Sequence, residues 1–405
     1  MSAGAAIPAH VPQDLVRDFS FWRTPGMAPT PNGDPQAALS FVHQGPRIFY
    51  APNNTVQGHG TWVITRADDQ RRVLQDPATF SSDRAVYAST LGENWRLVPF
   101  ESDPPSHSYY RTLLNPLLSP KRVTAMEAGA RERAVRLIET FKDKGECEVM
   151  QDFAFPFAVG VFLQFLGLPD SRRPEFLRWA DQLLHSTEIT ERVAAMGTIK
   201  KFMEDLVKLR RREPADDFMT YVIQADVDGR PLTDDEATGM GALIFTAGLD
   251  TVASAIGFDL RHLAQNPDDQ ERLRANPALI PSAVEEMFRA FATVQMLRVV
   301  TKDTEFEGIQ MKAGDWVSCA TMIANRDPHE FPEPNRIDLS RENNRHTAFA
   351  YGPHRCLGSH LARRELIIGL EEYLARLPPF RIKPGTAPIA HGGFVFSIKD
   401  LYLSW

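Results

Sequence analysis

The stretch FAYGPHRCLGSHLARRE, residues 349–365, contains Cys356, one of three cysteines in the chain. Cys356 follows a Gly-Pro-His turn and precedes a predicted helix, whose first turn offers free backbone N–H groups and partial positive charge. Both favour a thiolate over a thiol. Gly352 and Gly358 allow the backbone to pass close to a flat ligand. These residues fit an axial thiolate ligand of haem iron, although a lone cysteine is more often a small buried hydrophobe.

A second pair of chemically useful residues, Asp250 and Thr251, lies inside the long apolar stretch PLTDDEATGMGALIFTAGLDTVASAIGFDLRHLAQNP, residues 231–267. Apolar neighbours on all sides predict a buried helix, and a buried acid needs a function or a partner. A hydroxyl beside a carboxylate can hold an ordered water and relay protons inward from solvent. Gly248 and Thr251 also predict a local loosening of the helix. The alternative is an ordinary surface pair.

The cysteine stretch resembles the cysteine loop of the cytochrome P450 family, Phe-x-x-Gly-x-His/Arg-x-Cys-x-Gly. The match runs through Phe349, Gly352, His354, Cys356 and Gly358. It is the most specific motif in the chain. The resemblance covers the chain from about residue 60 to its end and implies a haem b cofactor with Cys356 as the iron ligand.

Three further stretches match this family in its order along the chain. HSYYR (107–111) is similar to the helix that grips the haem, AGLDT (247–251) to the oxygen-binding part of the central helix, and EMFR (286–289) to the Glu-x-x-Arg pair. The resemblance implies structural roles for Glu286, Arg289 and Arg341, and a catalytic role in O2 activation for Asp250 and Thr251. The implied haem-binding residues are Cys356, His107, Arg111, Arg298, His354, Phe349 and Gly248.

Within the family, the chain resembles the bacterial camphor-hydroxylase group through GLDTV, HLARRE, DGRPLTDDEA and its ending. This implies a class I system, in which a reductase passes electrons from NADH to an acidic 2Fe–2S ferredoxin. A basic patch on the Cys356 side of the protein would steer that partner. Candidate patch residues are Arg71, Arg72, Arg111, Arg345, Arg355, Arg363 and Arg364.

The resemblance also assigns a substrate pocket, where this chain departs from the group. Trp95 falls where camphor hydroxylases carry a hydrogen-bonding tyrosine, and the pocket as a whole is apolar and partly aromatic. A small apolar substrate is expected: a terpenoid, a norisoprenoid such as an ionone, or a small aromatic hydrocarbon. A monovalent cation near Gly92 and Glu93, with Asp83, is a further possibility. The implied pocket residues are Trp95, Phe100, Leu243, Thr246, Ala247, Val294 and Phe394.

Two other functions compete with a monooxygenase. A peroxide-driven peroxygenase would be expected to replace the acid–alcohol pair with an arginine, so Asp250 and Thr251 argue against it. A non-enzymatic haem sensor would need no proton relay and often carries an output domain, for which the chain has no spare segment.

The elements that must position these residues are mainly helical. The chain reads as helix from about residue 105 to 290, with strands at 46–50 and 61–66, a hairpin at 306–320 and a strand-rich end after Pro378. The pattern does not alternate strand and helix, which excludes a doubly wound fold. The expected architecture is mainly α with small peripheral β-sheets, a cytochrome P450 fold with the haem between the long central helix and the cysteine loop. One domain, 1–405, is expected, with an irregular lead-in over 1–40.

Composition narrows the setting. A net charge of −7 argues against nucleic acid as partner, and 43% hydrophobic with 24% charged residues is typical of a soluble globular protein. Three cysteines without a CxxC pair favour the cytoplasm. The sequence shows no secretory signal, and we expect no apolar run near the roughly 18 residues that span a bilayer. A monomer is expected.

Overall fold

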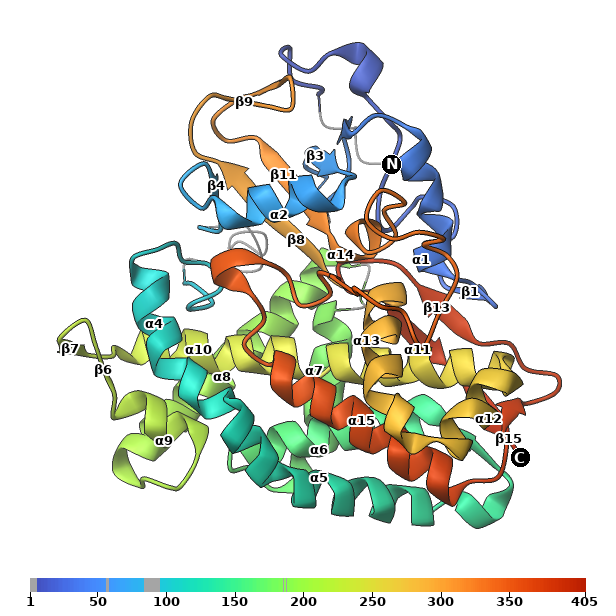
Figure 1. The fold of residues 1–405 in the computed structure, drawn as a ribbon. Helices are drawn as coiled ribbons and strands as arrows, with labels where there is room; N and C mark the ends of the chain where they lie inside the picture. The colour runs from blue at the N-terminus through green and yellow to red at the C-terminus, as the bar shows by residue number, and fades with distance from the viewer. Residues whose placement is uncertain (1–5, 56–57, 84–94, 185, 187) are drawn as a thin grey trace.

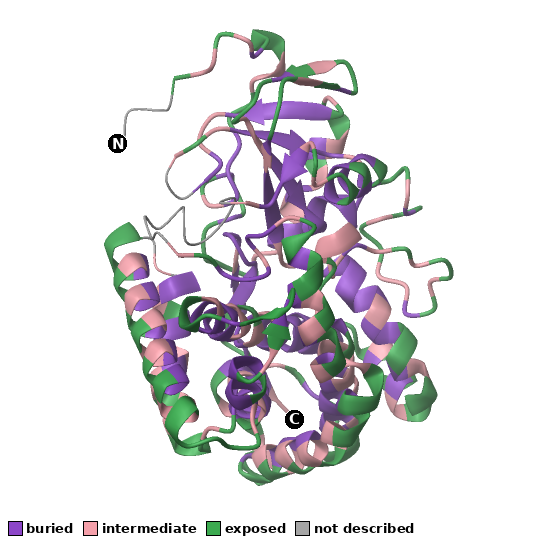
Figure 2. Ribbon diagram, turned by 90° about the vertical axis from the view of Figure 1, so that its left-hand side faces the viewer, coloured by how far each residue is buried: buried purple, intermediate pink, exposed green. Residues whose placement is uncertain are grey.

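The computed structural model describes residues 6–55, 58–83, 95–184, 186 and 188–405. Helices make up one half of the molecule and most of the sheet structure lies at the other end, with the cysteine loop between the two (Figure 1). Figure 2 shows that the strands are almost wholly buried, whereas outer helices alternate buried and exposed residues along their length. The predicted architecture, mainly α with small sheets, is therefore confirmed.

The helices follow one another along the chain as short N-terminal elements and then long ones. They are α1 (Pro35–Ala38), α2 (Ala67–Gln75), α4 (Ser106–Leu114), α5 (Pro120–Glu139), α6 (Phe155–Phe165), α7 (Arg173–Leu184), α8 (Ile189–Arg212), α9 (Phe218–Ile223), α10 (Asp234–Gly248), α11 (Thr251–Gln265), α12 (Pro267–Ala275), α13 (Ile280–Ala290), α14 (Thr321–Ala324) and α15 (Ser359–Arg376).

The strands form small, mostly antiparallel sheets. They are β1 (Thr30–Pro31), β2 (Ile48–Ala51), β3 (Thr61–Ile64), β4 (Phe80–Ser81), β5 (Glu146–Glu148), β6 (Asp226–Val227), β7 (Arg230–Pro231), β8 (Gln295–Val300), β9 (Thr304–Phe306), β10 (Ile309–Met311), β11 (Trp316–Ala320), β12 (Arg381–Ile382), β13 (Ile389–His391), β14 (Ser397–Asp400) and β15 (Tyr402–Ser404). The largest sheet has the order β2-β3-β11-β8-β4, and it carries Arg298 on β8.

The predicted hairpin over 306–320 is wrong in part. A tight hairpin exists, but it joins β9 to β10, with Phe306 opposite Ile309. The following strand β11 leaves the hairpin and pairs with β3 in parallel and with β8 in antiparallel register. Its partners lie on both sides of it in the central sheet, so most of its residues are buried.

The long central helix is interrupted where the sequence predicted loosening. α10 begins with a capping box in which the Thr233 side chain and the Glu236 side chain each bind the other's backbone N–H. Regular helix stops at Gly248, Leu249 and Asp250 lie between, and α11 starts at Thr251. The break therefore falls at the acid–alcohol pair itself.

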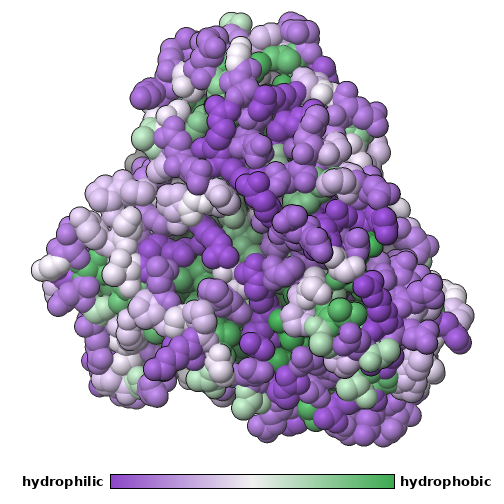
Figure 3. Space-filling model, viewed as in Figure 1, coloured by the Kyte–Doolittle hydropathy of each residue, from purple (hydrophilic) through white to green (hydrophobic). Residues whose placement is uncertain are grey.

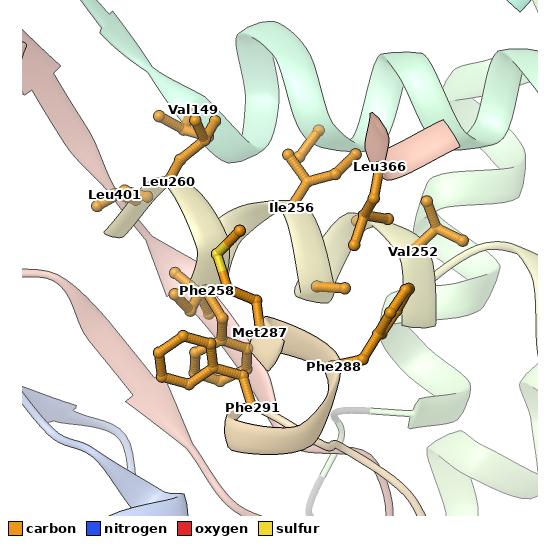
Figure 4. Packing of buried hydrophobic residues seen from close by; sticks show 14 of the residues in the cluster. Val149, Val252, Ile256, Phe258, Leu260, Met287, Phe288, Phe291, Leu366 and Leu401 are labelled. Carbon is orange, nitrogen blue, oxygen red and sulfur yellow. The ribbon is translucent and has the colours of Figure 1, made fainter. Parts of the chain in front are cut away.

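The core beneath the site is formed where α11 crosses α13 and α15. Figure 4 shows Val252 and Ile256 of α11 close to Leu366 of α15, and Phe258 beside Phe291. The two phenylalanine rings are stacked with centroids 5.8 Å apart. This packing fixes α11 relative to the helix that follows the cysteine.

The expectation about apolar runs needs correction. The stretch Asp234–Gln265, 32 residues, is long and apolar enough to cross a membrane by length and composition, and 72% of its most apolar window is buried. That burial is the property of a core helix, since the stretch comprises α10 and α11.

Candidate active site

The cysteine loop is held in one conformation by its own backbone. The Cys356 N–H donates to the carbonyl of Phe349 (2.8 Å), which closes the loop on itself. Gly352 has φ +69°, and a Cβ there would lie 2.4 Å from the carbonyl oxygen of Leu74 in α2. Only glycine fits this position, because it has both a left-handed backbone and no room for a side chain.

The Cys356 side chain itself is exposed, unlike Cys147 and Cys319, which are buried. Its surroundings still desolvate it, and burial raises the pKa of the thiol against the opposing effects of the Gly358 N–H and of Arg111, Arg355 and Arg363. The two observations agree if the sulfur faces a hollow enclosed by protein. Three arginines and a backbone donor then surround the place where a thiolate would form.

The central helix presents an open stripe within an otherwise buried stretch. Leu243 and Thr251 are partly exposed and Ala247 is exposed, whereas Ala242, Phe245 and Thr246 are buried. Positions four apart share a helix face, so these three residues form one stripe. Figure 3 shows a recess bordered by hydrophobic residues between the sheet-rich end and the helices. A stripe of this kind is the wall of an internal space.

Four residues bring hydrogen-bond donors together beside the cysteine loop; we call them the donor cluster: His107 and Arg111 of α4, Arg298 of β8 and His354 of the loop. The two imidazole rings lie with centroids 4.1 Å apart. Both ring nitrogens of His107 and Nε2 of His354 are buried without a hydrogen-bond partner.

The charge balance of the donor cluster is one-sided. Desolvation, with the cations Arg111 and Arg298, lowers the pKa of His107 to about 4. Desolvation, Arg298 and His107 lower that of His354 to about 2. Burial also lowers the pKa of Arg298, whose one printed hydrogen bond goes to the carbonyl of Leu297 (2.7 Å). Within the described part of the chain, no acidic side chain forms an ion pair with the cluster.

A second charged group, the Glu286 corner, is complete. Glu286 and Arg289 of α13 are fully buried and form a bidentate pair at 2.8 Å in both contacts. Nε of Arg341 donates to both Glu286 oxygens at 3.1 and 3.0 Å, so the implied trio is observed. Two partners of Glu286 went unpredicted, the Asp338 N–H (2.9 Å) and the Asn344 amide (3.2 Å). Neither belongs to a motif.

Comparisons with known proteins agree with this geometry. The family model described as cytochrome P450 matches residues 170–390. Over 401 residues the chain is 57% identical to a protein of Sinorhizobium fredii named probable cytochrome P450 127A1, covering 98% of this chain and 97% of that protein. The chain belongs to the cytochrome P450 family. The resemblance inferred from the motifs is thereby confirmed.

Other relatives in the family have named activities or solved structures. The chain is 33% identical to a steroid C26-monooxygenase of Mycobacterium tuberculosis, over 90% of this chain and 92% of that one. The crystal structure of CYP101J2 matches with a TM-score of 0.88 and 34% identity, and that of CYP101C1 with 0.88 and 32%; each match covers 99% of this chain and all of the other. The protein is a cytochrome P450 monooxygenase with haem as cofactor.

The donor cluster fits the haem of a cytochrome P450. Buried donors without acceptors are costly, and two carboxylates at the edge of the macrocycle would satisfy them. The hollow between the exposed Cys356 and the open stripe of α10 has an apolar wall on the helix side. Arg111 is less committed to this role than the others, because it also donates to Asn115 Oδ1 (3.1 Å) and to the carbonyl of Arg355 (2.7 Å).

The acid–alcohol pair lies at the helix break. Thr251 Oγ1 donates to the carbonyl of Ala247 (3.0 Å), and the Asp250 side chain is buried. Gly248 faces Phe162, whose ring would lie 3.0 Å from a Cβ at that position. Glycine at this point lets α6 approach the central helix closely.

The pocket residues lie at different depths. Thr246 is buried and donates to the carbonyl of Leu243 (3.0 Å), so its hydroxyl is used within the helix. Phe394 is buried and Phe100 and Val294 are partly exposed. Trp95 stands out, since its indole N–H is buried and has no acceptor among the described residues. The Lys200 ammonium lies 5.8 Å from its ring centroid, a contact that the sequence did not suggest.

Two further expectations have different outcomes. Gly92 and Glu93, assigned to a cation site, lie outside the described residues, and Asp83 is engaged in an ion pair with Arg96 (2.7 Å). In the expected basic patch, Arg71 and Arg363 are wrong as open docking points. Arg71 is buried and binds Asp68, Glu330 and the carbonyl of Arg345, and Arg363 is bound bidentately by Glu285. Arg345 and Arg355 are exposed.

Proposed function

We propose that this monooxygenase hydroxylates a small apolar substrate of the terpenoid or norisoprenoid class, such as an ionone, with electrons from NADH delivered through a ferredoxin reductase and a 2Fe–2S ferredoxin. One atom of O2 enters a C–H bond of the substrate, and the other leaves as water with two electrons and two protons. We further propose that residues 1–405 form one domain that acts as a monomer in the cytoplasm.

The apolar stripe on α10 is the observation that carries the substrate class. Leu243 and Ala247 face the internal space, with Phe394 and Val294 on the sheet side. Such walls bind a substrate by removing apolar area from water, about 25 cal/mol per Å2. The buried indole N–H of Trp95 supplies one polar anchor, so a substrate with one oxygen acceptor is favoured over a pure hydrocarbon. A small aromatic hydrocarbon is the alternative.

The chain's own residues provide cofactor binding and proton delivery. When bound, the haem supplies the iron at which O2 is reductively activated. Cys356 would hold the iron as a thiolate, and the donor cluster would hold the two propionates. The Thr251 hydroxyl orders a water at the helix break, and Asp250 passes protons to that water from outside. The break supports this role, because it leaves Thr251 bonded to Ala247 O through its side chain.

The exposed arginines support an acidic electron donor. Arg345 and Arg355 lie beside the cysteine loop, in a protein whose formal charge is −7. A positive patch on an acidic protein steers a negatively charged partner and makes association depend on salt. Reduction by an acidic ferredoxin should therefore slow as ionic strength rises.

The test of the cysteine assignment is the spectrum of the reduced carbon monoxide complex. The wild-type protein should show the far-red-shifted Soret band of thiolate ligation, and Cys356→Ala should abolish it while Cys147→Ala keeps it. A wild-type band at the imidazole-ligated position would overturn the assignment.

The substrate class is tested by optical titration. Terpenoids, ionones and small arenes are added in turn, and displacement of water from the iron is followed as the low- to high-spin shift. The proposal expects the largest shifts and tightest binding from ionones or terpenoid ketones. A panel in which only arenes produce the shift would replace it with the alternative.

The proton-delivery role is tested with Thr251→Ala. This variant should keep consuming NADH but divert much of it to hydrogen peroxide, because the ordered water is lost. Thr246→Ala is the matched control, since its hydroxyl is used within the helix. Fully coupled product formation by Thr251→Ala would refute the role.

A further inference from the structure

Arg363 of α15 is immobilised on the inner side of the cysteine loop. Its Nε and Nη2 donate to the two carboxylate oxygens of Glu285 at 2.5 and 2.9 Å. Nη1 reaches the carbonyl of Ser359 (3.3 Å), and Cζ lies 4.3 Å from the ring centroid of Phe349. A planar guanidinium is suited to binding a carboxylate at its edge and an aromatic ring at its face.

Phe349 passes this restraint on to the cysteine. Its ring packs edge-on against Phe288, with centroids 4.7 Å apart, so it lies between Phe288 and the Arg363 guanidinium. Its carbonyl accepts the Cys356 N–H at 2.8 Å. A ring that cannot shift fixes the carbonyl of the same residue, and that carbonyl fixes the peptide that carries the thiol.

Glu285 anchors the arrangement. Burial alone would raise its pKa, but hydrogen bonds from His346 and Arg363 outweigh burial and lower it to about 2. Glu285 is therefore ionised at every pH at which the protein functions. His346 also accepts the Ala348 N–H through Nδ1 (3.2 Å), one residue before Phe349, so both ends of this carboxylate contact reach the loop.

The neighbouring Arg364 provides the contrast. Its one printed ion pair is a long contact to Glu127 (3.5 Å), and its side chain is 39% exposed against 24% for Arg363. Arg363 is one of the three arginines that favour the Cys356 thiolate electrostatically, whereas Arg364 is not among them. Two adjacent arginines of one helix thus have different surroundings.

We propose that Arg363 is a positioning residue for the cysteine loop: through Glu285 and Phe349 it fixes the Cys356 peptide and holds a permanent positive charge near the sulfur. This role goes beyond the proposed function and removes Arg363 from the surface that an electron donor contacts. A fixed cation stabilises the state with one more electron, so it raises the reduction potential of the bound haem.

The experiment compares Arg363→Gln, Arg363→Lys and Arg364→Gln. The first readout needs no haem: hydrogen exchange of the Cys356 amide in the apo-protein. The second is the reduction potential of the holo-protein by spectroelectrochemistry, and the third is the rate at which the reduced carbon monoxide complex loses its thiolate band.

Arg363→Gln should speed exchange of the Cys356 amide severalfold, shift the potential to more negative values and speed loss of the thiolate band severalfold. Arg363→Lys should keep most of the potential but still speed exchange, because charge is retained and the bidentate stacked geometry is not. Arg364→Gln should change neither the Cys356 amide nor the potential.

Two outcomes would overturn the proposal. One is wild-type exchange and potential in Arg363→Gln together with slower reduction by a purified acidic 2Fe–2S ferredoxin, which would make Arg363 a docking residue. The other, available if Arg363→Gln does not fold, is additivity of Arg363→Lys and Phe349→Leu on the potential, since residues acting through each other cannot be additive. A wild-type protein without a thiolate band would instead refute the Cys356 assignment, independently of both.

Discussion

Two buried arginines, Arg289 and Arg298, lie nine positions apart in the chain, on either side of the Cys356 loop, and their surroundings differ. Arg289 uses all its donors: two bonds to Glu286 and three to the carbonyls of Asn325, Pro334 and Arg336. Arg298 has one printed hydrogen bond, to the carbonyl of Leu297. One guanidinium is fully bound by protein, and the other is not.

The same difference holds for the groups around them. The Glu286 corner contains a carboxylate that accepts from Arg289, Arg341, Asn344 and the Asp338 N–H. The donor cluster contains two imidazoles with buried unpartnered nitrogens and no ion-paired acid in the described part of the chain. A charged group that satisfies itself stabilises the protein alone. A cluster that holds only donors requires a ligand that brings acceptors.

The largest effect is expected from breaking the self-sufficient region. Glu286→Gln replaces the carboxylate with an amide and leaves two arginines with an uncompensated buried charge. We expect a loss of about 3–5 kcal/mol in the free energy of unfolding, in apo- and holo-protein alike. Denaturant unfolding measures it, with the exposed Glu342→Gln as control. Wild-type stability in the apo-protein would contradict the assignment of this corner to the fold.

The donor cluster should respond to pH in the apo-protein. The pKa of His107 is about 4 in the folded state and 6.5 in its ordinary state, so the unfolded chain binds the extra proton first. Stability is therefore full above pH 6.5 and falls as the pH drops toward 4, by up to about 3 kcal/mol.

The check on this prediction is the difference between wild type and His107→Gln. Apo-protein unfolding free energies are measured from pH 7.5 to pH 5, and the wild type should lose more than the variant. Haem should reduce the difference, because propionates favour the charged imidazole. Equal pH profiles for the two apo-proteins would show that His107 is not buried as a neutral group.

Arg298→Leu sharpens the comparison, since it should separate stability from cofactor retention. Removing an unpaired buried charge leaves the apo-protein as stable as wild type or about 1 kcal/mol more stable. Haem, however, should transfer to an acceptor apo-globin severalfold faster. Arg298→Lys, which keeps the charge, should lose haem more slowly than the leucine variant. An apo-protein destabilised as strongly as Glu286→Gln would erase the distinction between the two arginines.

How far the sequence could predict these regions depended on whether a residue's partners belong to a motif. Glu286, Arg289 and Arg341 were found because their spacing is characteristic, and Thr233 because a helix N-cap is a local signal. Arg71 and Arg363 were misassigned to an open patch, since their acids, Glu330 and Glu285, lie 259 and 78 positions away. The strand β11 failed for the same reason, because its partners β3 and β8 are chosen by the sheet and not by the preceding turn.

The smallest effect concerns Trp95, which extends the comparison to the substrate side. Its indole N–H is a buried donor without an acceptor among the described residues, like the nitrogens of the donor cluster. If a substrate oxygen is that acceptor, Trp95→Phe should weaken binding of an ionone by about 0.5–1.5 kcal/mol, a factor of roughly 2–10, and leave binding of the oxygen-free hydrocarbon analogue nearly unchanged. Spin-state titration of both ligands measures the ratio. Phe100→Leu, which removes only apolar contact, should weaken both ligands equally, and the same behaviour in Trp95→Phe would show that the ring and not its N–H matters.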